Sequence, residues 1–342
     1  MRVADRVPPL AGLAVAVVAV STSAILVRYS DAPSTVKALY RVAFTVLLLA
    51  PAALTRSRAS FARLRRRDAV AAGLAGVALA VHFAAWFRAI ELTSIAASVT
   101  LVQAHPLFVA VGAWALLGER VTRRTVLGIV VTVLGMAGMS AGDLIDGATG
   151  PAPLVGDALA VTGAVAAAGY FLAGRSIRQR VPLVPYVVVV YAACAVALLG
   201  VALVEGVPLL GYPGREWLLF LAMAIGPGLF GHTVLNWALG HLQSSVVSAS
   251  LLGEPVGASL LALVLLGEVP TLATVLGGTV VLVGIAVTVR ARETPDVDVD
   301  VDDDPKGPER PVDAGSGSGS GPGSPPASVD AVDADGGPET DG

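Results

Sequence analysis

Uninterrupted apolar stretches recur along most of this chain, and their length of about 20 residues is what a helix needs to cross a lipid bilayer. The 342-residue chain is 55% hydrophobic and only 14% charged, whereas a soluble domain is about 25% charged. Lipid must therefore act as the solvent for much of the chain, and in lipid only helices or closed barrels satisfy the backbone. The stretches lack the apolar–polar alternation of barrel strands, which are about 10 residues long. The sequence thus predicts an all-α integral membrane protein.

Ten spans are predicted from these stretches and the polar connections between them. They cover about residues 10–28, 34–54, 69–90, 94–117, 123–141, 154–174, 184–204, 216–238, 244–266 and 270–290. The 55–67 connection holds six arginines, and cytoplasmic loops are enriched in Lys and Arg, so both termini are expected in the cytoplasm. A cleaved secretory signal would also begin with basic residues and an apolar run. The first run continues past its small residues, which favours a retained helix.

The chain contains an internal repeat with an offset of 149 residues. The pairs that match at this offset include Pro106 and Pro255, Gly118 and Gly267, and Glu119 and Glu268. A repeat this long indicates a duplicated membrane unit, since solenoid repeats are about 20–50 residues long. Five spans per copy is an odd number, so the second copy must be inverted, as in many transporters.

The predicted domains follow this duplication. They are a first five-helix repeat at 1–141, a connecting loop at 142–153, a second five-helix repeat at 154–292 and a tail at 293–342. The tail holds 14 of the 26 acidic residues and few apolar ones, so it is expected to be disordered. Its Asp-rich run could bind a cation or magnesium pyrophosphate, but a solvated tail is preferred because nothing orders the carboxylates.

Glu254 is the leading functional candidate, because an ionisable group at mid-membrane depth is costly and is usually functional or tightly paired. Its carboxyl group could load a proton or meet a cationic group of a substrate; the alternative is a structural pair with a nearby polar group. At the repeat offset Glu254 lies opposite His105. Each is followed by a proline, which frees a backbone carbonyl one turn earlier, although a simple packing kink would need the same proline.

Other polar side chains are expected to face the same cavity. They are His82, Trp86, Gln103, His232 and Asn236. His82 and Trp86 are one helical turn apart, as are His232 and Asn236, so the two residues of each pair share a face of their helix. The alternative is that each histidine bonds a neighbouring helix and the tryptophan fills space.

Two basic residues, Lys37 and Arg41, lie one turn apart in the second span. Lys37 is interpreted as structural, because its long side chain can extend outward toward the membrane surface. Arg41 is deeper, and it could be a counter-ion for Glu254 or for an anionic substrate.

Glu119 and Glu268 are interpreted as structural. Gly118 and Gly267 are expected to end one helix, so that each glutamate lies just before the next helix, whose positive end favours a carboxylate. Glycines at 128, 135, 277 and 284 are expected to let the fifth and tenth spans pack closely.

Catalytic signatures such as His-Glu-x-x-His and Gly-x-Ser-x-Gly do not occur. The single cysteine, Cys194, excludes a disulfide within the chain. No enzyme activity, no cofactor and no metal site are therefore expected.

The paired segments at 106–119 and 255–268 resemble those of the EamA-type, ten-span members of the drug/metabolite transporter superfamily. Arg28-Tyr-Ser-Asp-Ala-Pro33, Arg41 and Glu254-Pro255 add to a resemblance that covers about residues 10–290. It implies alternating access, with spans one to four and six to nine around a central cavity. Family members handle amino acids, small metabolites, drugs or nucleotide-sugars, and no motif here selects among these.

The predicted function is secondary transport of a small metabolite, amino acid or drug-like solute, with export as the expected direction and proton coupling as an option. The expected location is the plasma membrane, and the expected partners are the solute, the bilayer and protons. A homodimer is left open, and nucleic acid is not expected. The alternative is a non-transporting membrane protein, either a lipid-embedded enzyme or a scaffold, that uses the same fold.

Overall fold

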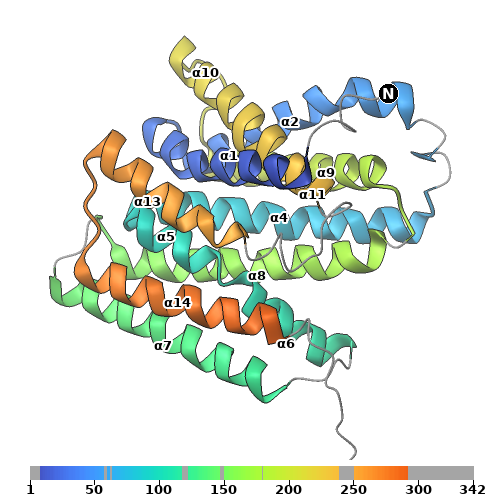
Figure 1. The fold of residues 1–342 in the computed structure, drawn as a ribbon. Coiled ribbons are helices and arrows are strands. Elements are labelled where there is room, and N and C mark those ends of the chain that lie inside the picture. The colour runs from blue at the N-terminus through green and yellow to red at the C-terminus, as the bar shows by residue number, and fades with distance from the viewer. Residues whose placement is uncertain are drawn as a thin grey trace, which may run out of the picture. The chain divides into compact units, whose positions relative to one another are not determined.

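The computed structural model describes residues 8–57, 60–61, 64–117, 122–146, 150–178, 180–238 and 250–291 (Figure 1). The predicted acidic tail, Gly118 and Glu119 lie outside these ranges. Within the ranges every regular element is helical. The elements are α1 (Pro9–Tyr29), α2 (Ser34–Arg56), α4 (Arg66–Leu92), α5 (Ile95–Val102), α6 (His105–Leu117), α7 (Arg123–Asp146), α8 (Pro153–Arg178), α9 (Leu183–Glu205), α10 (Gly214–Met223), the π-helix η2 (Ala224–Thr233), α11 (Val234–Ala238), α13 (Gly253–Leu266) and α14 (Leu272–Ala291).

Eight segments of the described chain are long and apolar enough to cross a bilayer. Two further helical paths complete the set of predicted spans: α13, which is apolar but has 14 residues, and the continuous run α10–η2–α11. The prediction of an all-helical, multi-pass membrane protein is therefore confirmed. The exact number of ten spans stays a prediction.

The predicted fourth span is two helices, because α5 ends at Val102 and α6 begins at His105. Pro106 has no N–H to donate to the carbonyl of Val102, which explains the break. The second half of the chain has the same kind of break 149 residues later, because the helix is interrupted at Leu252, just before α13. Two broken helices, one from each half, therefore meet near the middle of the bundle.

The predicted eighth span contains Gly226-Pro-Gly228, a combination that often kinks or breaks a helix. The helix nevertheless continues there and widens into η2. A π-helix shifts the hydrogen bonds to the i+5 pattern and so accommodates Pro227 without ending the helix. Its glycines also allow neighbouring helices to pack closely, since a Cβ at Gly228 would lie only 2.6 Å from Thr45 Oγ1 of α2. This span is continuous but wider than an α-helix.

The helices α7 and α14, which correspond in the two halves, pack directly against each other (Figure 1, green and orange). A Cβ at Gly128 would lie 2.7 Å from the backbone nitrogen of Thr288, and one at Gly277 would lie 2.9 Å from that of Met139. These two contacts are the same contact shifted by the repeat offset. Residue numbers rise along α7 as they fall along α14, so the two helices run antiparallel. The prediction that small residues bring these helices together is confirmed.

The other helices of the two halves interlock in the same reciprocal way. The helix α4 of the first half packs against α8 of the second, and the counterpart of this contact is α1 of the first half against η2 of the second. The helices α2 and α9, which correspond to each other, also pack together. The largest buried apolar cluster lies among α1, α2, α4 and α9, so the centre of the bundle is built from both halves.

Candidate functional site

A cavity of about 110 Å³ lies within the bundle, between helices of both halves. None of the described residues of α7 or α14 lines it. Its polar and aromatic lining residues are Ser23, Arg41, His82, Phe83, Trp86, Gln103, His105, Tyr170, Phe171, Tyr191, His232 and Glu254. Seven of the eight residues predicted to face solute are thus brought together; the side chain of Asn236 lies outside the description. We refer to this space as the central cavity.

Glu254 meets Gln103 where the two broken helices face each other. Gln103 Nε2 donates to Glu254 Oε2 at 2.5 Å, and Ser21 Oγ donates to the backbone carbonyl of Glu254 at 3.4 Å. Gln103 lies in the break before α6, and Glu254 lies in the first turn of α13. The carboxyl group therefore has a built-in partner, but this partner is a neutral amide and does not compensate a charge.

Arg41 lies inside α2 with only 2% of the residue exposed. Its Nη1 donates to Ser23 Oγ at 3.0 Å. Its guanidinium carbon lies 4.5 Å from the centre of the Phe83 ring and 5.6 Å from that of Phe87. No ion pair at contact distance joins Arg41 to Glu254, although the two charges act on each other from the walls of one cavity. The hypothesis that they are counter-ions stays a prediction.

Aromatic rings surround these polar groups. His82 stacks with Trp86 at 5.9 Å between ring centres, and its Nδ1 lies 2.9 Å from the carbonyl oxygen of Gly163 in α8. His105 stacks with Phe171 at 4.8 Å. His82 therefore contacts a neighbouring helix, as the structural alternative predicts, and its ring also lines the cavity.

Sequence analysis missed Tyr170, Phe171 and Tyr191, which line the cavity from α8 and α9. Aromatic residues make up only 5% of the chain, so an aromatic pair or a tyrosine within a predicted span is a signal that could have found them. Within the described ranges, no group of three or more His, Cys, Asp and Glu residues could hold a metal ion. The cavity can therefore bind a small solute through charge, hydrogen bonds and ring contacts.

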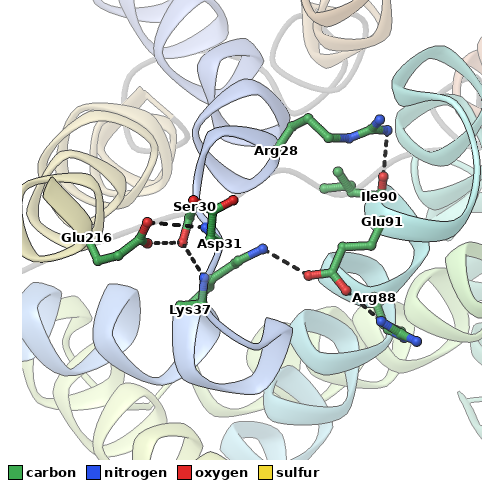
Figure 2. A network of polar contacts seen from close by, with 9 residues as sticks. Arg28, Ser30, Asp31, Lys37, Arg88, Ile90, Glu91 and Glu216 are labelled. Carbon is green, nitrogen blue, oxygen red and sulfur yellow. Dashed lines mark hydrogen bonds and ion pairs between the residues drawn. The ribbon is translucent and has the colours of Figure 1, made fainter. Parts of the chain in front are cut away.

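A second polar cluster, the connection network, lies where α1 meets α2, α4 meets α5, and α13 meets α14. Figure 2 shows its part around Arg28, Lys37 and Glu216. Its charged and hydroxyl members are Arg28, Ser30, Asp31, Lys37, Arg88, Glu91, Arg215, Glu216 and Glu268. Most of these groups have a partner of opposite charge. The network thus ties the connections of both halves together at one end of the bundle.

Lys37 belongs to this network, and its contacts fit the structural role predicted for it. The residue is 2% exposed, and its Nζ donates to Glu91 Oε1 at 2.8 Å. Arg88 donates to the other oxygen of Glu91 at 2.7 Å. One carboxylate therefore holds a cation from α2 and a cation from α4.

Glu268 is structural but does not cap the helix that follows it. Its Oε1 accepts from the backbone nitrogen of Ile95 at 2.6 Å, at the start of α5, and its Oε2 lies 3.4 Å from Arg28. The beginning of α14 is instead capped by Thr271, which accepts from the backbone of Thr274. Gly267 ends α13 as expected, with a φ of 65° that favours glycine.

Arg28 and Glu216 complete the network. Arg28 Nη2 donates to the carbonyls of Ile90 at 2.6 Å and Thr93 at 3.0 Å, which closes the α4–α5 turn against α1. Glu216, in the first turn of α10, accepts from Ser30 Oγ and from the backbone nitrogen of Asp31. These contacts join the α1–α2 turn to the α9–α10 connection.

The comparisons with known proteins agree with this architecture. The EamA-like transporter family matches residues 9–141 and 154–290. A search of curated proteins gives no match. Among solved structures, one described as "Crystal structure of protein" has a TM-score of 0.58 and 23% identity, covering 82% of this chain and 96% of that one. That likeness shows a shared fold, and the family match, which covers both repeats, shows that this chain belongs to the EamA-like transporter family.

Proposed function

We propose that this protein is a secondary transporter that carries a small solute by alternating access, with the central cavity as its solute site. The observation that carries the proposal is the meeting of two broken helices, one from each half, at a buried cavity lined by Arg41, Gln103 and Glu254. Broken helices that place polar groups at mid-membrane depth are typical of transporter sites. Family membership supports transport as the general activity.

The connection network supports a closed state at one end of the cavity. It joins turns from both halves through the ion pairs of Lys37, Arg28 and Arg215. We infer ten spans with an inverted second repeat, and repeat domains at 1–141 and 154–292 joined by the 142–153 loop. The arginine-rich 55–67 connection then lies in the cytoplasm and the network at the extracellular face. The proposed location is the plasma membrane.

Glu254 is the proposed proton-coupling residue, and export is the proposed direction. Its carboxyl group faces the cavity beside a neutral amide, so it can hold a proton without disturbing an ion pair. His82, His105 and His232 also line the cavity and are the other groups that can exchange a proton. A homodimer is compatible with this mechanism but is not needed for it, since both halves of the cavity come from one chain.

Transport is tested with purified full-length protein in liposomes, using uptake and efflux of radiolabelled amino acids, nucleosides and cationic drugs. At least one solute should move faster than in protein-free vesicles and should raise the thermal stability of the protein. A protein that moves none of them and is stabilised by none would favour the alternative, a scaffold or lipid-embedded enzyme with this fold.

Topology is tested by cysteine labelling in a Cys194→Ala background. Asp146→Cys should react only with reagent added outside, and the matched variant Ser57→Cys only after the cytoplasmic side is opened. Labelling of residue 146 from the cytoplasm alone would overturn the orientation.

A further inference from the structure

Arg41 is a buried cation that makes no ion pair at contact distance with a carboxylate of the described residues, although the charge of Glu254 acts on it from the same cavity. Its guanidinium group carries five N–H donors, and the side-chain contacts found for it use one, to Ser23 Oγ at 3.0 Å. The rings of Phe83 and Phe87 stabilise its charge from α4, but rings do not replace hydrogen-bond acceptors in the plane of the guanidinium. The residue forms part of the cavity wall.

Lys37, one turn earlier on α2, is a second buried cation with which Arg41 can be compared. Lys37 is as buried as Arg41, but it has Glu91 at 2.8 Å. A charge inside a membrane span is costly unless it is paired. On α2, Lys37 has a carboxylate in contact and Arg41, one turn later, does not. We therefore expect a contacting acceptor for Arg41 to enter the cavity from outside the protein.

Glu254 does not take that place in this conformation. Its carboxyl group is held by Gln103 at 2.5 Å, and no ion pair joins it to Arg41. Arg41 and Glu254 therefore both lie on the wall of the central cavity without contacting each other as an ion pair.

Trp86 provides a second, independent sign of a ligand. The residue is 4% exposed, and its indole Nε1 is buried without a hydrogen-bond partner. A buried donor without an acceptor carries the full cost of lost hydration. Since Trp86 lines the same cavity as Arg41, one ligand with acceptor oxygens can satisfy both groups.

The other residues that line the cavity indicate the shape and size of the uncharged part of that ligand. The stacked pairs His82–Trp86 and His105–Phe171 present flat ring surfaces, which favour a planar, partly apolar group. A cavity of about 110 Å³ limits the ligand to a small molecule.

We infer that Arg41 is the anion-binding residue of the central cavity, and that the solute carries a carboxylate attached to a small planar body. A guanidinium group binds a carboxylate through two parallel hydrogen bonds, which the neutral or cationic analogue of the same solute cannot form. The inference rests on the proposed function, because it names the class of solute that the transport site accepts.

The test uses three probes of nearly the same shape and different charge: benzoate, benzamide and benzylamine. Binding to the full-length protein in detergent is measured by isothermal titration and by the shift in melting temperature. Benzoate is expected to bind and stabilise the protein, and the other two are expected to bind at least about 10-fold more weakly, because a charge-assisted hydrogen bond is lost. Equal binding of all three probes, tighter binding of benzamide or benzylamine, or no binding of any would each overturn the inference.

Variants then assign the effect to residues. Arg41→Gln should weaken benzoate binding by about 10-fold to 100-fold, whereas the matched variant Lys37→Gln, one turn away, should leave it unchanged. Trp86→Phe keeps the ring, removes the N–H and should weaken benzoate binding several-fold; it carries the test alone if Arg41→Gln does not fold. Unchanged benzoate binding in folded Arg41→Gln, or in Trp86→Phe where that variant stands alone, would contradict the inference.

The inference and the proposed function fail separately. If the wild-type protein transports a cationic or neutral solute in liposomes but does not bind benzoate, the transporter function stands and the role of Arg41 is wrong. If benzoate binds through Arg41 but no solute, benzoate included, crosses the membrane, the site is correct and the transport proposal is wrong.

Discussion

Lys37 and Arg41 occupy neighbouring turns of α2 and are equally buried, yet they belong to different kinds of site. Lys37 lies in the connection network, where Glu91 neutralises it. Arg41 lies in the central cavity, where its contacts are a hydroxyl group and two rings. The burial of a charged side chain within a membrane span is therefore not enough to identify its role. Charges that have partners in the chain hold helices together, and a charge without one is available to a ligand.

The largest expected effect concerns the carboxyl group of the cavity. Glu254→Gln keeps an oxygen that can accept from Gln103, so the variant should fold, but it cannot release a proton. Uptake of the solute found in the liposome screen should lose its response to an imposed pH gradient. Glu91→Gln, the same change in the connection network, is the control and should keep that response. An unchanged pH response in Glu254→Gln would remove this residue from proton coupling.

Replacing the two cations of α2 by methionine tests the comparison directly. Lys37→Met removes one of the two cations that neutralise Glu91, and breaking a buried pair is strongly destabilising, so the melting temperature in detergent should fall by about 5 °C or more. Arg41→Met removes an unpaired buried charge and should leave the melting temperature unchanged or higher. The reverse order would mean that Arg41 is the structural cation.

Glu268→Gln should open the network end of the cavity without unfolding the protein. The amide oxygen can still accept from Ile95, but the ion pair with Arg28 is lost. We expect faster labelling from outside of a cavity cysteine, Leu79→Cys in the Cys194→Ala background, by about two-fold to five-fold, since the pair is partly exposed and worth about 1 kcal/mol or less. Slower labelling from outside would show that the network does not close this end.

The smallest effect is expected at the exposed rim of the network. The side chains of Arg215 and Asp31 are 57% and 87% exposed, and exposed ion pairs contribute little to stability. Asp31→Asn should therefore shift the melting temperature by about 2 °C or less. A shift as large as that of Lys37→Met would mean that exposure does not separate the strong members of the network from the weak ones.

The sequence was sufficient to predict the helical membrane fold, the repeat and seven of the polar and aromatic residues that line the cavity. Apolar length identifies a span, and a polar residue within a span must face protein or a cavity, so His105, Gln103 and Glu254 could be named before their neighbours were known. The match of Gly128 with Gly277 likewise predicted the close contact of α7 and α14. Each of these inferences uses only the residue pattern of a single helix, or its match with the corresponding helix of the other repeat.

The partners of the charged residues could not be predicted in the same way. Glu91 is 54 residues from Lys37, and Ile95 is 173 residues from Glu268. Which helices lie side by side depends on packing over the whole bundle, so local spacing assigned Glu268 to the wrong helix and did not identify Glu91 as the partner of Lys37. Gly226-Pro-Gly228 also permits either a break or a π-helix, and its composition does not choose between them.

The glycine contacts between α7 and α14 have a consequence for the ancestry of the chain. Gly128 meets Thr288 as Gly277 meets Met139, so the interface places the same surface of each half against its copy, as in a two-fold symmetric dimer. A single ancestral half could therefore have paired with a second, oppositely inserted copy of itself through this surface. Fusion of the two genes would then have needed no new interface, only a connection long enough to join them.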